Sequence, residues 1–304
     1  MNVLVTGASG FIGRALCQRL VESGHDVSGI VRDVRSQIPN VKLIELADLE
    51  QVEFQHLVGV DIVFHVAGLA HQRKVDVGQF HRVNVICTRK IAKACVEAKV
   101  GRLIYISSTK AVSEGSVGPL MKPNPESDYG ESKRQGELEV LEIAGWSQMQ
   151  AVVVRIPLTF GVGVKGNFRS LVQLAAKRIP IPLAALGAMR SFLGLENLME
   201  FLELCMTHNN VVGRCVLVCD SERISLGKLI EDLSKAQGNK LRLINISEPF
   251  LRSMTKYLLP RKVHRQLFEH CLVDISETIE LTGWQPKYST TDGVYQMFGQ
   301  FDEA

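Results

Sequence analysis

The sequence predicts an α/β protein in which a doubly wound, parallel-sheet domain precedes a smaller, mostly helical domain. Three observations support this fold class. Short apolar runs alternate with amphipathic segments as far as residue 156, a glycine-rich turn follows the first run, and the alternation loosens after Pro157. Strands that alternate with helices form right-handed βαβ units, and such units build a parallel sheet with helices on both faces.

The elements of the first half follow from these two periods. Each expected strand is a short, mainly apolar run, as in a sheet that is buried on both faces. In the first expected helix, Ile12, Leu16 and Leu20 share one face, and Gly24 stands where glycine commonly ends a helix. The expected strands are Asn2–Thr6, 27–31, 41–46, 61–66, 102–107 and 151–156, and the expected helices are 11–23, 79–98 and 129–143.

The boundary between the two domains is expected near residue 160. Pro157, Gly161, Gly163 and Gly166 mark a loop there. We therefore assign residues 1–160 to the first domain and 161–304 to the second. The apolar run 215–219 predicts one later strand that rejoins the first domain.

Composition excludes several classes of protein. The chain has 304 residues, of which 46% are hydrophobic and 22% charged, as in ordinary globular proteins. The formal net charge of +3 is too small to indicate a nucleic-acid-binding protein. The seven cysteines include no C-x-x-C pair, which favours free thiols over disulfides or a metal site. With no signal-like leader and no uncharged stretch of about 20 residues, we expect a cytoplasmic protein without a membrane span.

The glycine-rich turn predicts a dinucleotide-binding (Rossmann) domain. Gly7 permits a tight turn, Gly10 lets the backbone approach a pyrophosphate, and Gly13 lets helix and strand pack closely. The start of the following helix supplies unpaired N–H groups and the positive end of the helix dipole. The expected cofactor contacts in this turn are Gly7, Ser9, Gly10, Phe11, Ile12 and Gly13.

The end of the second strand bears on the choice between NADP and NAD. An acidic residue there commonly binds the ribose hydroxyls of NAD, but this sequence has Val31 followed by Arg32. Arginine can pair with the 2′-phosphate of NADP, so NADP is the leading prediction. Asp33 could instead serve as the acid, which would favour NAD. After the third strand, Asp48 and Leu49 can reach the adenine, although Asp48 could equally be a helix N-cap.

Tyr129 and Lys133 form the predicted catalytic pair. They are spaced i, i+4 on an expected helix and therefore point the same way. A nearby ammonium group favours the phenolate form of tyrosine, so that Tyr129 can exchange a proton with an alcohol or ketone near neutral pH. Ser107 and Ser108 end the fifth expected strand, where α/β sheets bind ligands, and Ser108 can hold the same substrate oxygen.

These motifs make the chain resemble the extended short-chain dehydrogenases/reductases that act on nucleotide sugars. The resemblance is carried by the glycine turn and by His65–Gly68 (HVAG), Tyr129–Lys133 (YGESK), Arg155–Gly161 (RIPLTFG), Arg190–Leu198 (RSFLGLENL) and Asp274–Pro286 (DISETIELTGWQP). Ser107–Val112 (SSTKAV) and Gly163–Phe168 (GVKGNF) are most similar to bacterial UDP-N-acetylhexosamine 4-reductases and UDP-glucose 4-epimerase-like proteins.

The resemblance implies specific residue roles. Ser108, Tyr129 and Lys133 would be catalytic, and Lys133 would also hold the nicotinamide ribose. Ala67 and Gly68 would lie beside the cofactor, and Asn84 would brace the strand ends near it. Asn167 and Arg190 of the second domain would hold the diphosphate of a UDP-sugar. Members of this family often dimerise through the helices expected here at 79–98 and 129–143, so a homodimer is expected.

Three functions remain open at this stage. The leading hypothesis is NADPH-dependent reduction of a UDP-4-keto-6-deoxy-N-acetylhexosamine for surface-polysaccharide (O-antigen) synthesis, and Arg32 favours it. The alternative is a 4-epimerase of UDP-glucose or UDP-N-acetylglucosamine with retained NAD. A hypothesis of another class is a non-catalytic nucleotide-binding protein.

Residues 252–270 combine basic and apolar side chains. Arg252, Lys256, Arg261, Lys262 and Arg265 stand among apolar residues. Such a segment can lie on an anionic membrane surface. The alternative, which the sequence favours, is a solvated basic face beside an apolar face that packs into the core.

Overall fold

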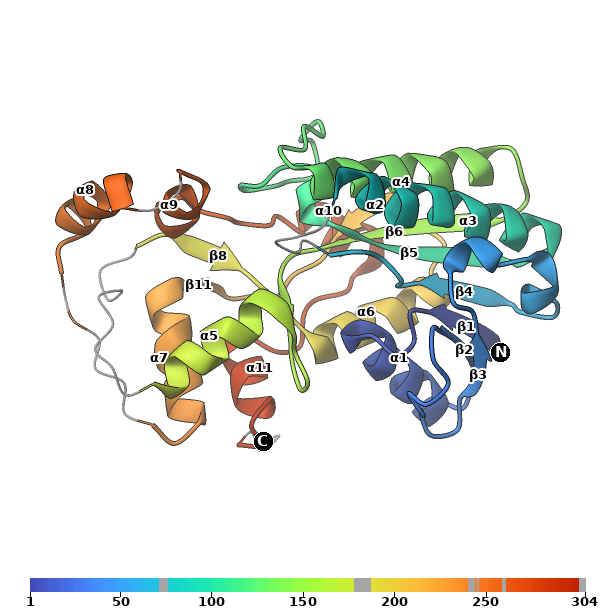
Figure 1. The fold of residues 1–304 in the computed structure, drawn as a ribbon, viewed down its shortest axis with the longest axis horizontal. Helices are drawn as coiled ribbons and strands as arrows, with labels where there is room; N and C mark the ends of the chain where they lie inside the picture. Colours follow the sequence, from blue (N-terminus) through green and yellow to red (C-terminus); the bar gives the residue numbers. More distant parts are fainter. Residues whose placement is uncertain (71–75, 178–186, 240–243, 245, 259–260, 301–304) are drawn as a thin grey trace.

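The computed structural model describes residues 1–70, 76–177, 187–239, 244, 246–258 and 261–300 (Figure 1). Within them, a seven-stranded parallel sheet has the order β10-β6-β5-β4-β1-β2-β3. The fold class predicted from the sequence is therefore confirmed. The strands are β1 (Asn2–Thr6), β2 (Asp26–Val31), β3 (Lys42–Glu45), β4 (Ile62–His65), β5 (Arg102–Ser108), β6 (Gln150–Ile156) and β10 (Cys215–Leu217).

Helices cover both faces of this sheet, as Figure 1 shows. The helices α1 (Phe11–Glu22) and α6 (Leu195–Thr207) pack on one face, and α3 (Cys87–Glu97) and α4 (Asp128–Gly145) pack on the other. Along β1, Val3 and Val5 belong to the first core cluster and Leu4 to the second. This alternation explains why the central strands are mainly apolar: helices cover both of their faces.

The helix predicted over 79–98 differs from the observed chain. It consists of α2 (Val77–His81), a π-helical segment η3 (Arg82–Ile86) and α3. A single π turn within an α-helix frequently marks a functional site, and here it contains Asn84. Short 3-10 helices lie at η1 (Leu49–Gln51), η2 (Phe54–Leu57) and η4 (Thr109–Ala111).

The remaining elements form a second, smaller core next to the sheet. Phe160, Phe168, Leu229 and Val294 are among its buried side chains. The β10 strand and α6 follow residue 160 in the chain, yet both pack with the large sheet. The other elements are β7 (Thr159–Phe160), α5 (Gly166–Ala176), β8 (Met189–Ser191), β9 (Leu193–Gly194), β11 (Arg223–Ser225), α7 (Leu226–Ala236), α8 (Glu248–Leu258), α9 (Arg261–Phe268), α10 (Ser276–Thr282) and α11 (Thr290–Gln296).

Across the described residues, we find no helix whose length and hydropathy would let it cross a bilayer.

Candidate functional site

The glycine turn between β1 and α1 offers backbone donors to a phosphate group. Gly7 has φ +69°, and a Cβ on Gly13 would lie 2.2 Å from the carbonyl oxygen of Gly7. Both positions therefore require glycine. Gly10 is exposed, and α1 starts without a side-chain cap and without an acidic residue in its first turn. The first N–H groups of a helix lack partners within it, so the turn fits the pyrophosphate of a dinucleotide.

A continuous series of contacts joins this turn to the predicted catalytic lysine. A Cβ on Gly7 would lie 2.8 Å from the Cα of Ala67. A Cβ on Gly68 would lie 3.2 Å from Oδ1 of Asn84 and 3.6 Å from Nζ of Lys133. The two residues Ala67 and Gly68, which follow β4, thus lie between the glycine turn and the π-helical segment. The structure brings the predicted residues Gly7, Ala67, Gly68, Asn84 and Lys133 together.

Asn84 fixes the loop that follows β4. Its Oδ1 accepts the backbone N–H of Leu69 at 2.8 Å, and its Nδ2 donates to the carbonyl oxygen of Leu69 at 3.1 Å. Nδ2 also donates to Oγ of Ser132 at 2.9 Å, next to Lys133 on α4. Asn84 therefore ties the loop after β4 to the helix that carries Tyr129 and Lys133.

Ser108 and Tyr129 form the predicted hydroxyl pair. Ser108 is the last residue of β5, and Tyr129 lies in the first turn of α4, where the Ser108 hydroxyl is near enough to affect the pKa of Tyr129. A Cβ on Gly130 would lie 2.4 Å from the carbonyl oxygen of Lys110, so glycine lets α4 begin this close to the end of β5. Burial raises the pKa of Tyr129, and the nearby Ser108 hydroxyl opposes this rise.

Lys133 lies below this pair in a largely apolar setting. Its Nζ donates to the carbonyl oxygen of Ile106 at 2.7 Å and lies 4.1 Å from the centre of the Tyr105 ring. The side chain is buried. Burial lowers its pKa to about 7, and the charge of Glu137 opposes this fall. Near neutral pH, Lys133 can therefore exist both as the charged ammonium and as the neutral amine.

A buried carboxylate, that of Glu137, lies beneath the predicted catalytic residues. The sequence analysis did not predict a role for it. Arg155 on β6 donates to both of its oxygens, at 2.8 and 2.7 Å. Ser107 donates at 2.6 Å and Arg134 at 3.0 Å. Because Ser107 precedes Ser108, this network joins α4, β5 and β6 directly beneath the site. A carboxylate four residues after Lys133 on the same helix was the signal that could have found it.

His65 connects the glycine turn to α3. Its Nδ1 is 2.7 Å from Oγ1 of Thr6, and its Nε2 is 2.9 Å from Oγ1 of Thr88. Thr6 in turn accepts the N–H of Ala67 at 3.2 Å. Burial, together with the nearby Lys133 charge, lowers the pKa of His65 to about 3. The ring is therefore a neutral structural link.

The residues expected near the adenosine are engaged in different ways. Arg32 is exposed directly after β2. The carboxylate of Asp33 pairs with Arg35 at 2.6 Å and also accepts its backbone N–H. Asp48 caps η1 by accepting the N–H of Glu50, and it also forms an ion pair with Arg82. Asp48 is thus an N-cap, while its role toward adenine and that of Leu49 stay predictions.

Arg190 borders a cavity of about 430 Å³. Arg252, His264 and Arg265 from α8 and α9 line it together with Glu114 and Glu126 from the region that precedes α4. Arg265 pairs with Glu126 at 2.7 Å and with Glu269 at 3.2 Å. The lining thus carries three arginines and three glutamates, Glu269 included, and with Arg265 paired, Arg190 and Arg252 are the guanidinium groups in it that suit a phosphate-bearing ligand. Asn167 is exposed in the first turn of α5 and is not among the residues lining this cavity.

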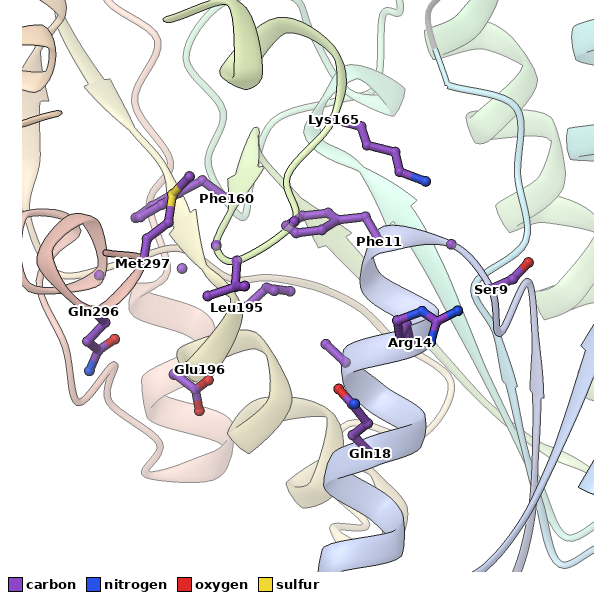
Figure 2. Close-up of a pocket in the computed structure, with 17 residues that line it drawn as sticks. Ser9, Phe11, Arg14, Gln18, Phe160, Lys165, Leu195, Glu196, Gln296 and Met297 are labelled. Carbon is purple, nitrogen blue, oxygen red and sulfur yellow. The ribbon is translucent and has the colours of Figure 1, made fainter. Parts of the chain in front are cut away.

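A second cavity, of about 490 Å³, adjoins the start of α1. Figure 2 shows Phe11 and Arg14 of α1 on one side, Gln296 and Met297 on the other, and Leu195 of α6 between them. Lys165 brings a positive charge to the lining, which also includes Ser9 and Gly10. The first turn of α1 is therefore bordered by the C-terminal half of the chain.

Comparison with known proteins places these features in a family. Residues 3–219 match the model of the NAD dependent epimerase/dehydratase family. A UDP-glucose 4-epimerase of Vibrio cholerae is 29% identical over the whole chain and 96% of its own length. A 2-alkyl-3-oxoalkanoate reductase of Stenotrophomonas maltophilia is 34% identical over 78% of this chain and 76% of its own.

Solved structures share the fold. UDP-glucuronic acid 4-epimerase from Bacillus cereus, in complex with NAD, superposes with a TM-score of 0.79 at 23% identity and covers 99% of this chain and 96% of its own. UDP-glucose 4-epimerase from Thermotoga maritima, with UDP-glucose, gives a TM-score of 0.79 at 19% identity, with 99% and 98% covered. At these identities the likeness establishes the fold alone.

Proposed function

The chain belongs to the NAD dependent epimerase/dehydratase family and is therefore an enzyme, and we propose that it transfers hydride at C4 of a UDP-linked sugar. The observation that carries this proposal is the arrangement of Ser108, Tyr129 and Lys133 at the ends of β5 and α4, on the side of the sheet that also bears the glycine turn. The leading reaction is reduction of a UDP-4-keto-6-deoxy-N-acetylhexosamine.

The side chains divide the chemistry between them. A nicotinamide cofactor, when bound, would supply hydride for the C4 carbonyl carbon. Tyr129 donates its hydroxyl proton to the C4 oxygen, so the ketone becomes an alcohol, and Ser108 holds that oxygen by a hydrogen bond. Lys133 stabilises the phenolate that remains on Tyr129. Asn84, Ile106 and Glu137 hold this group in place through the hydrogen bonds described above.

The cavity beside Arg190 supports a nucleotide diphosphate as the anchoring part of the substrate. Guanidinium groups bind phosphate oxygens in a planar, two-pronged manner. In a lining where Arg265 is paired with Glu126 and Glu269, the guanidinium groups of Arg190 and Arg252 favour such a ligand over the acyl chains of a 2-alkyl-3-oxoalkanoate. Arg190 is the proposed diphosphate ligand in this cavity, whereas the role of Asn167, which does not line it, stays a prediction.

NADP is the proposed cofactor because of the residues that follow β2. Asp33, the acid that could bind the ribose hydroxyls of NAD, is occupied by Arg35, whereas Arg32 is exposed. A guanidinium group at this position suits the 2′-phosphate of NADP. A reductase must exchange its cofactor after each turnover, and NADPH is the exchangeable reductant that this position favours.

A 4-epimerase with retained NAD is the second candidate. The Vibrio cholerae relative, which matches the whole chain, favours it. The same Ser108, Tyr129 and Lys133 would first remove the proton of the C4 hydroxyl group, while the hydrogen on C4 would leave as hydride to bound NAD, and would later return that proton, so these residues do not distinguish the two reactions.

A homodimer through α3 and α4 forms part of the proposal. Ile86, just before α3, and Leu138 on α4 are 36% and 49% exposed, which provides apolar surface for a partner helix pair. Sedimentation velocity tests this: Leu138→Glu should convert a dimer to a monomer.

A direct assay tests the proposed reaction. The protein is mixed with NADPH and a UDP-4-keto-6-deoxy-N-acetylhexosamine, and the loss of NADPH absorbance and the product NMR spectrum are followed. We expect stoichiometric NADPH consumption and a new C4 hydroxyl group. Failure to consume NADPH, with conversion of UDP-glucose or UDP-N-acetylglucosamine into its C4 epimer, would assign the protein to the second candidate instead.

A further inference from the structure

The outer face of α8 is apolar and exposed. Phe250, Met254, Tyr257 and Leu258 recur at helical spacing and are 60%, 41%, 84% and 71% exposed. The opposite face packs inward, where Leu251 is 3% exposed and joins Phe268 in a small core. The sequence favoured an apolar face turned to the core. The structure shows that α8 has a second apolar face turned outward.

Positive charge accompanies this face. From Pro249 to Phe268 the chain carries Arg252, Lys256, Arg261, Lys262 and Arg265 and no acidic residue. Because the whole chain has a net charge of only +3, the residues outside this stretch are together net acidic. On α8 itself, Arg252 and Lys256 are exposed, and Nζ of Lys256 lies 5.9 Å from the centre of the Tyr257 ring. On α8, two exposed basic side chains thus accompany the exposed apolar residues, against one acidic side chain, that of Glu248 in its first turn.

The position of α8 leaves this face open. Figure 1 shows α8 at one end of the longest dimension of the molecule, opposite the β1–β3 edge of the sheet. The neighbouring α9 supplies Phe268 behind α8, and Arg252 stacks over that ring at 5.3 Å. A flat surface could therefore meet the outer face of α8 without meeting the sheet.

We propose that α8 docks the enzyme on an anionic phospholipid bilayer, with Phe250, Met254, Tyr257 and Leu258 inserted at the headgroup level. An amphipathic helix with aromatic and aliphatic residues on one face and basic residues beside them binds such interfaces, and each lysine or arginine near an anionic surface adds to the affinity. The cavity beside Arg190 shares Arg252 with this helix, so docking places the substrate cavity near the membrane surface. This inference does not depend on the proposed reaction.

Vesicle sedimentation with the purified full-length chain tests the inference. Vesicles of phosphatidylcholine alone are compared with vesicles that also contain phosphatidylglycerol, at low and high salt. We expect binding to the anionic vesicles only, weakened by salt. Phe250→Ser/Tyr257→Ser should lower the partition coefficient at least about tenfold, and Lys256→Glu should lower it by about fivefold or more.

A matched control distinguishes insertion of α8 from non-specific hydrophobic adsorption to the vesicles. Val58→Ser/Trp146→Ser removes two apolar side chains, 67% and 60% exposed, that lie far from α8 in the sequence, and it should bind like the wild type. Equal binding to both vesicle types, or unchanged binding of Phe250→Ser/Tyr257→Ser, would overturn the inference. So would a shift of that variant from dimer to monomer in sedimentation velocity without any vesicle binding by the wild type, which would assign the face to a second copy of the chain.

Discussion

Arg155 on β6 donates two hydrogen bonds, of 2.8 and 2.7 Å, to the buried Glu137 carboxylate of α4. This pair joins the helix of Tyr129 and Lys133 to the strand beside Ser108. Both charges are largely removed from water, since the Glu137 side chain is fully buried and that of Arg155 is 10% exposed. The proposed catalytic residues are therefore positioned by a buried ion pair.

Removing the Glu137 charge should destabilise the fold. Glu137→Gln leaves Arg155 buried without its counter-charge, and breaking a buried pair in this way costs about 3–5 kcal/mol. Urea unfolding followed by circular dichroism measures the loss. Glu131→Gln, exposed on the same helix, is the control and should change stability by less than about 0.5 kcal/mol. A loss no larger than that of the control would contradict the structural role of the pair.

His65 should make stability fall in acid. Its pKa is about 3 in the folded chain against 6.5 ordinarily, so between these values the unfolded chain binds a proton that the folded chain excludes. Stability is therefore lost as pH falls from about 6.5 toward 3, and the His65 contribution to the loss between pH 7 and pH 5 is about 2 kcal/mol. Unfolding free energies at the two pH values test this: His65→Gln should lack that component, whereas His81→Gln, exposed on α2, should retain it.

Tyr129→Phe should abolish most turnover while leaving cofactor binding intact. The phenyl ring keeps its contact with Phe80, whose ring centre is 6.0 Å away, but it has no proton to give. Loss of a general acid costs about 10²–10⁴-fold in rate. Turnover and cofactor Kd are measured on the same preparation. Unchanged turnover would show that another group donates the proton.

Arg32 should decide cofactor choice. Arg32→Ala removes the proposed partner of the 2′-phosphate, so NADPH affinity should fall about 10–100-fold, as expected for charge-assisted hydrogen bonds, while NADH affinity stays constant. Fluorescence titration gives both constants. Arg214→Ala, exposed just before β10, serves as the control and should change neither constant. Equal losses for the two cofactors would remove the 2′-phosphate role of Arg32.

Much of the fold followed from local patterns in the sequence. Apolar strands, helical spacing and the glycine turn are short-range signals, and they predicted β1 to β6 and the placement of Ser108, Tyr129 and Lys133 on strand end and helix. The π turn at Asn84 was not predicted, because it arises where α4 packs against it: a Cβ on Gly136 would lie 2.4 Å from the carbonyl oxygen of Asn84.

Long-range partners could not be predicted in the same way. Glu137 and Arg155 are each visible in the sequence, but only the folded sheet shows that they meet. The pairing of Arg265 with Glu126 across 139 positions is a similar case. The contact between Arg265 and Glu126 depends on how the C-terminal half lies against the first half, and a single sequence carries little information about that.

Identification of the nucleotide that the purified protein releases on denaturation tests the central proposal most directly. A reductase that exchanges its cofactor should release little nucleotide. Native protein from the same preparation, free of bound nucleotide, should then bind NADPH more tightly than NADH. One equivalent of NAD per chain would contradict this account, because a retained NAD is what an epimerase requires, and it would remove the role proposed for Arg32.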